Sequence, residues 1–156
     1  MIVRKGDGIK TIYGVREGLK YQTRADRPKE EQEKAFIIDG DPELLYKASF
    51  LANSPNYRAI PFLISWKESP QEFREKLKEI AQRKGRKIET EEDFREALRE
   101  LWEEIKALLF AGYKPEEIIC TAIAHEDTDN FHIHIYVANN FAFTGATLNL
   151  WYSHDD

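Results

Sequence analysis

The sequence contains one cysteine, Cys120, among its 156 residues. A single cysteine cannot form an internal disulfide, and it cannot supply the paired thiolates of a cysteine-rich zinc module. The chain also lacks a run of about 18 apolar residues that could span a membrane. The N-terminal segment 1–5 has no apolar stretch of signal-peptide length, so we expect a cytoplasmic protein with no membrane partner. These absences argue against secreted mini-proteins, zinc fingers and membrane proteins.

Positive charge is scarce overall, because 23 Lys and Arg face 28 Asp and Glu, which gives a net charge of −5. The cations are unevenly distributed: residues 1–29 hold eight Lys or Arg and only three acidic residues. A basic segment on an acidic body can present a local face to a polyanion. A solvated surface with uneven charge would give the same pattern, so charge does not decide between the two.

Hydrophobic spacing and end signals predict one α+β domain over residues 1–156, with a mostly antiparallel sheet that carries its helices mainly on one face. Helices are predicted from Ile9 to Tyr21, from Pro42 to Leu51, and after the capping boxes at Ser69 and Thr90. Apolar runs predict strands at 2–4, 35–38, 58–66, 117–125, 131–139 and 147–152. The polar segment 22–34 is expected to be a loop.

Three of the four histidines lie within ten residues, at His125, His132 and His134. Since His132 and His134 are two apart on a predicted strand, their side chains project from the same face. A hairpin that pairs His125 with His132 would add the third imidazole to that face. Three neutral imidazoles without a fourth protein ligand leave coordination positions for water and substrate oxygens. The pattern predicts a metal site, and chance clustering on an exposed face is the alternative.

Two carboxylates in the segment between the histidines, Asp127 and Asp129, are candidates to accept the outer N–H of a ligating imidazole. Such a contact would fix the tautomer of the histidine. Ligation by imidazoles alone accepts Mn²⁺ or Zn²⁺.

The segment HEDTDNFHIH, from His125 to His134, resembles the third motif of relaxases, the mobilisation nucleases of the HUH endonuclease superfamily. In that family the histidine string lies on two adjacent central strands and an asparagine follows, a place that Asn139 or Asn140 takes here. The tail 144–150 is similar to the turn and strand after the motif. The resemblance implies an HUH relaxase-like fold, a Mg²⁺ or Mn²⁺ cofactor, and cleavage of single-stranded DNA by a tyrosine.

Tyr21 is the predicted nucleophile. The segment 18–24, GLKYQTR, resembles the first relaxase motif, in which a tyrosine ends the first helix and precedes a T/S-R pair. A phenol is a poor nucleophile at neutral pH unless cations or a metal-bound phosphate assist it. Lys20, Arg24 and Arg27 surround Tyr21 in the most basic part of the chain, and we expect the same three residues to bind DNA.

Two other tyrosines are weaker candidates. Tyr13 lies on the same predicted helix, and Tyr136 shares the strand of His134 but has less freedom to reach a phosphate. Replication initiators of the superfamily place their tyrosine on a helix after the histidine pair, and no helical pattern follows His134. The upstream position of Tyr21 therefore favours the relaxase branch.

The resemblance implies site- and strand-specific nicking at an origin of transfer, through a 5′-phosphotyrosyl intermediate, during conjugative mobilisation of a plasmid or mobile element. The expected partners are single-stranded DNA and accessory mobilisation proteins, and the expected state is a monomer. Two features depart from the family. No histidine precedes the Ile64-Ser65 pair, where the middle motif of the family often has one. The further helices usual in relaxases do not follow the histidines, so a minimal nuclease and a fragment both stay open. The alternatives are an accessory module that binds origin DNA without cutting it, and a phosphoesterase in which water is the nucleophile.

Overall fold

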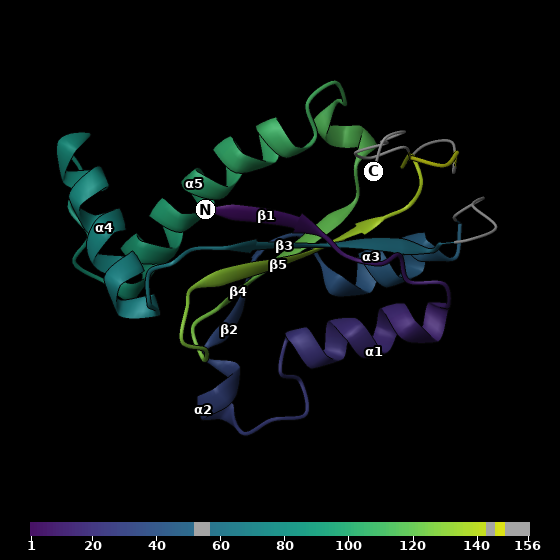
Figure 1. Cartoon of the computed structure of the whole chain (residues 1–156), viewed down its shortest axis with the longest axis horizontal. Coiled ribbons are helices and arrows are strands. Elements are labelled where there is room, and N and C mark those ends of the chain that lie inside the picture. Colours follow the sequence, from purple (N-terminus) through teal and green to yellow (C-terminus); the bar gives the residue numbers. More distant parts are fainter. Residues whose placement is uncertain (52–56, 143–145, 149–156) are drawn as a thin grey trace.

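Five antiparallel strands form one sheet in the order β1-β3-β5-β4-β2 in the computed structural model, which describes residues 1–51, 57–142 and 146–148 (Figure 1). The strands are β1 Ile2–Lys5, β2 Ala35–Asp39, β3 Ala59–Ser65, β4 Cys120–His125 and β5 His132–Ala138. The predicted α+β class with an antiparallel sheet is confirmed. β5 occupies the centre of the sheet, between β3 and β4.

The described helices begin at capping side chains, except the two shortest. They are α1 Ile12–Gln22, α2 Lys29–Gln32, α3 Pro42–Ser49, α4 Pro70–Arg83 and α5 Glu91–Leu109, followed by a short 3₁₀ helix, η1 Pro115–Glu117. Asp41 caps α3 with Pro42 in the first turn, and complete capping boxes open α4 at Ser69 and α5 at Thr90. Each cap satisfies backbone N–H groups that the first helical turn leaves without a partner.

Helices cover both faces of the sheet, so the prediction that they lie mainly on one face is wrong. On one face, α4 and α5 bury a large core around Trp102, Phe62 and Ile133 (Figure 1). On the other face, α1 and α3 bury a smaller core that includes Leu19 and Tyr136. The physical reason is that successive residues of β5 point to opposite faces, and both sets include large side chains that require cover.

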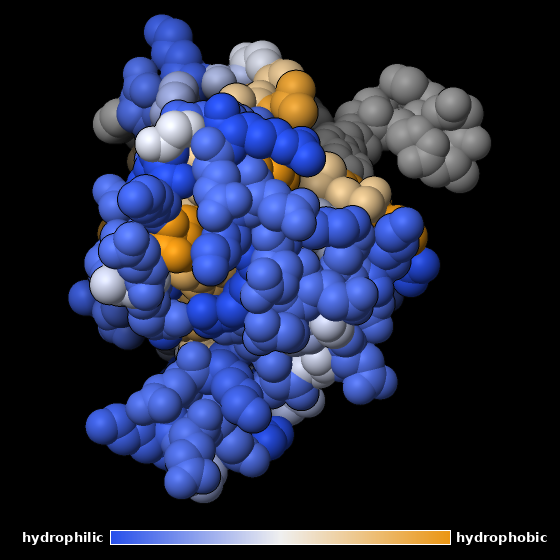
Figure 2. Space-filling view, turned by 90° about the vertical axis from the view of Figure 1, so that its left-hand side faces the viewer, coloured by the Kyte–Doolittle hydropathy of each residue, from blue (hydrophilic) through white to orange (hydrophobic). Residues whose placement is uncertain are grey.

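The segment predicted to be a loop, 22–34, contains the short helix α2. Of the predicted last strand, 147–152, the structure describes only residues 147 and 148, which are not in a strand. The rest of that prediction lies outside the described residues. The predicted turn at 144–145 also lies outside the described residues. Within the described part of the chain, no helix is long and apolar enough to cross a membrane. Figure 2 shows that the side of the molecule carrying α4 is mainly hydrophilic, with small apolar areas.

Candidate metal centre

The β4–β5 hairpin brings the three histidines together. His125 pairs with His132 across the hairpin and Ile123 pairs with His134, so all three imidazoles leave the sheet on the face that α1 covers. The ring centroids lie 4.5 to 5.0 Å apart. One ring nitrogen from each histidine lies within 4.8 Å of the others, which is close enough for the three to bind one metal ion.

Two backbone carbonyls fix the tautomers of two of these histidines. The Nε2 atom of His125 lies 2.7 Å from the carbonyl oxygen of Gln22, and the Nδ1 atom of His132 lies 3.2 Å from that of Asn130. A carbonyl oxygen only accepts hydrogen bonds, so both of these nitrogens carry the proton. The Thr128 hydroxyl also lies 3.2 Å from His132 Nδ1, and it donates its own hydrogen to the Asn130 carbonyl.

These tautomers leave lone pairs on the two remaining nitrogens, which face each other. His125 Nδ1 and His132 Nε2 are 3.2 Å apart. Two lone pairs at this distance repel unless a cation lies between them. A proton is a poor candidate at neutral pH, because burial lowers the pKa of His125 to about 4 and that of His134 to about 3, and also lowers the pKa of His132. The cluster is therefore suited to a metal ion.

The coordination of such an ion would be incomplete. In the part of the chain that the structure describes, the cluster contains three histidines and no Cys, Asp or Glu. Three protein ligands leave positions open for water or for substrate oxygens, as in catalytic metal sites. Ser65 of β3 pairs with His132 and so lies on the same face of the sheet.

The loop carboxylates do not hold the histidines as predicted. Gln22 and Asn130 accept the outer N–H groups, whereas Asp127 accepts from Arg24, with Nε–Oδ2 and Nη2–Oδ1 distances of 2.8 and 3.2 Å. Burial opposes the ionisation of Asp127, but the hydrogen bonds from Arg24 lower its pKa. Asp129 is exposed. Sequence reasoning could not find the true partners, because every residue carries a backbone carbonyl.

Tyr21 lies in the last turn of α1, one residue before the carbonyl that contacts His125. Its side chain is exposed, and the guanidinium groups of Arg24 and Arg27 lie 5.1 and 6.0 Å from the centre of its ring. The structure therefore brings the predicted nucleophile segment and the histidine cluster together, although they are about a hundred residues apart in the sequence.

The two alternative nucleophiles, Tyr13 and Tyr136, are less well placed than Tyr21 to act beside the histidines. Tyr13 is exposed in the first turn of α1, and Gln22 lies nine positions further along the helix, or about 13 Å along the axis. Tyr136 is buried beneath α1, and burial raises the pKa of its hydroxyl. A Cβ atom added at Gly18 would lie 3.2 Å from that hydroxyl, which shows how closely the helix covers it.

The three predicted DNA contacts differ in their exposure. Lys20 and Arg27 have half-exposed side chains that pair with Asp26 and Glu31. Arg24 is buried and uses its guanidinium on Asp127 and on the carbonyl of Tyr21. That Arg24 binds DNA stays a prediction, and within the protein its guanidinium already has these two partners.

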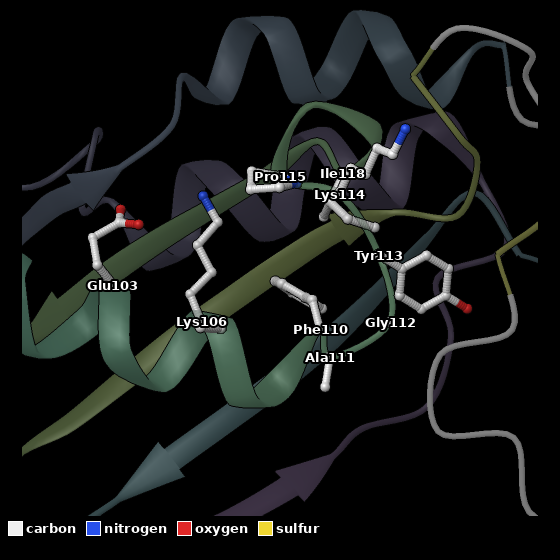
Figure 3. A pocket seen from close by; sticks show the side chains of 10 residues that line it. Glu103, Lys106, Phe110, Ala111, Gly112, Tyr113, Lys114, Pro115 and Ile118 are labelled. Carbon is white, nitrogen blue, oxygen red and sulfur yellow. The ribbon is translucent and has the colours of Figure 1, made fainter.

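A separate cavity of about 200 Å³ lies where α5 ends, on the other face of the sheet (Figure 3). Its lining includes Lys106 and Tyr113 but no histidine. The Lys106 ammonium donates to Asp39 Oδ2 at 2.8 Å, and the indole N–H of Trp102 donates to the same oxygen at 2.7 Å. These contacts tie β2 to α5, and the cavity is separate from the metal centre.

Comparison of the chain with models of protein families, with curated proteins and with solved structures finds no match.

Proposed function

We propose that the protein is a metal-dependent nuclease that nicks single-stranded DNA through Tyr21, in the manner of the relaxases whose motifs it resembles. The observation that carries the proposal is the pair of unprotonated nitrogens, His125 Nδ1 and His132 Nε2, facing each other at 3.2 Å beside the Tyr21 segment. The backbone contact between Gln22 and His125 supports the proposal, because it holds the segment that carries Tyr21 beside these nitrogens.

A divalent ion, Mg²⁺ or Mn²⁺, held by the three imidazoles would act as a Lewis acid on an oxygen of the scissile phosphate. Imidazole nitrogen suits Mn²⁺ better than Mg²⁺, so Mn²⁺ is the first ion to test. The buried imidazoles stay neutral at physiological pH because burial lowers the pKa of His125 to about 4 and that of His134 to about 3. Neutral imidazole is the form that binds metal.

The phenol oxygen of Tyr21 attacks the phosphorus and the bond from phosphorus to the 3′ oxygen breaks. The phenol loses its proton and the leaving 3′ oxygen gains one, so the products are a 5′-phosphotyrosyl link and a free 3′ hydroxyl. The guanidinium group of Arg27, 6.0 Å from the centre of the ring, supplies positive charge beside the phenol, whereas that of Arg24 is occupied by Asp127. Because one phosphodiester replaces another, the strand can be resealed without ATP.

Lys20 and Arg27 are exposed beside Tyr21 and are the residues proposed to contact the DNA backbone. The proposed substrate is an origin of transfer, cut by a monomer with accessory mobilisation proteins during conjugation. Phosphate contacts of this kind make binding weaken as salt increases.

The test is incubation of the protein with a randomised pool of single-stranded DNA and Mn²⁺, followed by denaturing electrophoresis. A 3′ label should appear in a covalent adduct with the protein, whereas a 5′ label should appear only in shortened free DNA. The adduct should disappear with EDTA and in Tyr21→Phe, and it should persist in the matched control Tyr13→Phe.

Other outcomes would support the other two functions. Cleavage that continues in Tyr21→Phe and forms no adduct would indicate a phosphoesterase that uses water. Salt-sensitive DNA binding without cleavage by the unmodified protein would indicate an accessory binding module. An adduct that survives in Tyr21→Phe and is lost in Tyr13→Phe would show that the nucleophile is assigned wrongly.

A further inference from the structure

We propose that Arg24 is a positioning residue, which holds the Tyr21 segment against the histidine hairpin through Asp127. The consequence for Tyr21 rests on the proposed function, whereas the attachment itself does not. The contact holds together two parts of the chain that are 103 residues apart in the sequence.

One guanidinium group connects the two segments. Arg24 donates from Nε and Nη2 to the two carboxylate oxygens of Asp127, and from Nη1 to the carbonyl oxygen of Tyr21 at 2.9 Å. The side chains of Arg24 and Asp127 are only 9% and 20% exposed. A bidentate pair that is largely removed from water has a defined geometry, unlike a single contact between exposed charges.

The backbone at Arg24 is the second observation. Its φ of 58° makes it the one non-glycine residue with a positive φ in the part of the chain that the structure describes. The N–H of Arg24 bonds the carbonyl of Tyr21, and the N–H of Ala25 bonds the carbonyl of Lys20. This is the Schellman pattern that ends a helix, and Arg24 occupies the position that usually holds glycine.

Glycine would end α1 at lower conformational cost, so helix termination does not account for an arginine at this position. The guanidinium contacts do account for it. The left-handed turn directs the side chain back to the helix end, where it meets both Tyr21 and the loop after His125. The hydrogen bond between His125 Nε2 and Gln22 is a second attachment of the same segment.

The positive φ at position 24 allows a glycine variant that keeps the backbone turn. Arg24→Gly preserves the left-handed turn and removes the whole side chain with its guanidinium, and Asp127→Asn removes the charge of the partner. In either variant we expect the rate of adduct formation at saturating DNA to fall at least tenfold. The affinity for Mn²⁺ should stay within about twofold, because the histidines lie on the sheet. Arg83→Gln, which removes an exposed charge at the end of α4, is the control and should change neither value.

The double variant should lose no more than the larger single loss, since both changes break the same contact. Equal losses of Mn²⁺ affinity and adduct rate would overturn the proposal, because Arg24 would then support the histidines and not Tyr21. An unchanged adduct rate in Arg24→Gly would overturn it as well.

Hydrogen exchange separates a failure of this proposal from a failure of the proposed function, because it requires neither DNA nor metal. In Asp127→Asn the amides of Arg24 and Ala25 should exchange at least tenfold faster, with the amides of β5 unchanged. If the amides exchange faster in Asp127→Asn but the unmodified protein forms no adduct, the attachment through Arg24 stands and the proposed nuclease function is refuted. Unchanged exchange would refute the attachment.

Discussion

Acidification should destabilise the metal-free protein before its carboxylates titrate, because the buried His125 and the half-buried His134 resist protonation in the folded state. A histidine has an ordinary pKa of 6.5, and burial lowers this value to about 4 for His125 and about 3 for His134. Below pH 6.5 the unfolded chain therefore binds protons at these two positions that the folded chain does not bind. Stability is complete above this pH and is lost as the pH falls toward the folded values.

The size of the effect follows from linkage. At about pH 5, each of the two histidines lowers the free energy of unfolding by about 2 kcal/mol relative to about pH 7.5, or about 4 kcal/mol together. The carboxylates of Asp127 and Glu91 have lowered pKa values and contribute stability that is lost at more acidic pH. A change in the free energy of unfolding between about pH 7.5 and about pH 5 is therefore caused mainly by the histidines.

The measurement is urea denaturation with EDTA present at the two pH values, followed by tryptophan fluorescence, to which the buried Trp102 contributes. His134→Gln should lose about 2 kcal/mol of the pH dependence of the unmodified protein, which is the share of His134. Mn²⁺ at neutral pH should stabilise the unmodified protein more than this variant, since the variant lacks one proposed ligand. A free energy of unfolding that does not change over the window, or a His134→Gln protein with undiminished pH dependence, would refute the reasoning.

Two substitutions test packing elsewhere in the fold, one in the turn after β2 and one in the large core. Gly40→Ala should cost more than about 2 kcal/mol, because a Cβ there would lie 2.1 Å from the carbonyl oxygen of Cys120 at a positive φ. Gly85→Ala is its control in urea denaturation and should cost about 1 kcal/mol, since Gly85 has a positive φ with nothing within 4 Å. Phe131→Ala should cost about 3–5 kcal/mol in the same assay, because its ring is fully buried and stacked on Phe73. Losses below about 1 kcal/mol for Phe131→Ala, or equal losses for the two glycine variants, would contradict these assignments.

The sequence predicts the features that depend on local signals. The caps at Asp41, Ser69 and Thr90 begin α3, α4 and α5 as predicted, because a capping side chain and the first helical turn are neighbours in the chain. The pairing of His125 with His132 was also predictable, since strand alternation fixes the face of each side chain once a hairpin is assumed.

Contacts between distant segments could not be predicted in the same way. The carbonyls of Gln22 and Asn130, which hold the histidines, belong to the backbone and leave no signal in residue type. Arg24 was predicted to bind DNA because it lies in a basic segment, but its nearest partner is the acidic Asp127, far along the chain. The second helical layer was missed because alternation on a strand indicates two faces but not which helices cover them.

The central strand connects the geometry of the histidine cluster to the stability of the fold. His132 and His134 lie on one face of β5, while Ile133 and Ile135 are fully buried in the core on the other face. A slip of one residue in the pairing would place the imidazoles in that core and move the isoleucines to the site. Burying two isoleucines and avoiding two buried polar rings both favour the observed register. The core that stabilises the sheet therefore also fixes which nitrogens meet, and the histidines acquire their geometry from the fold before any metal binds.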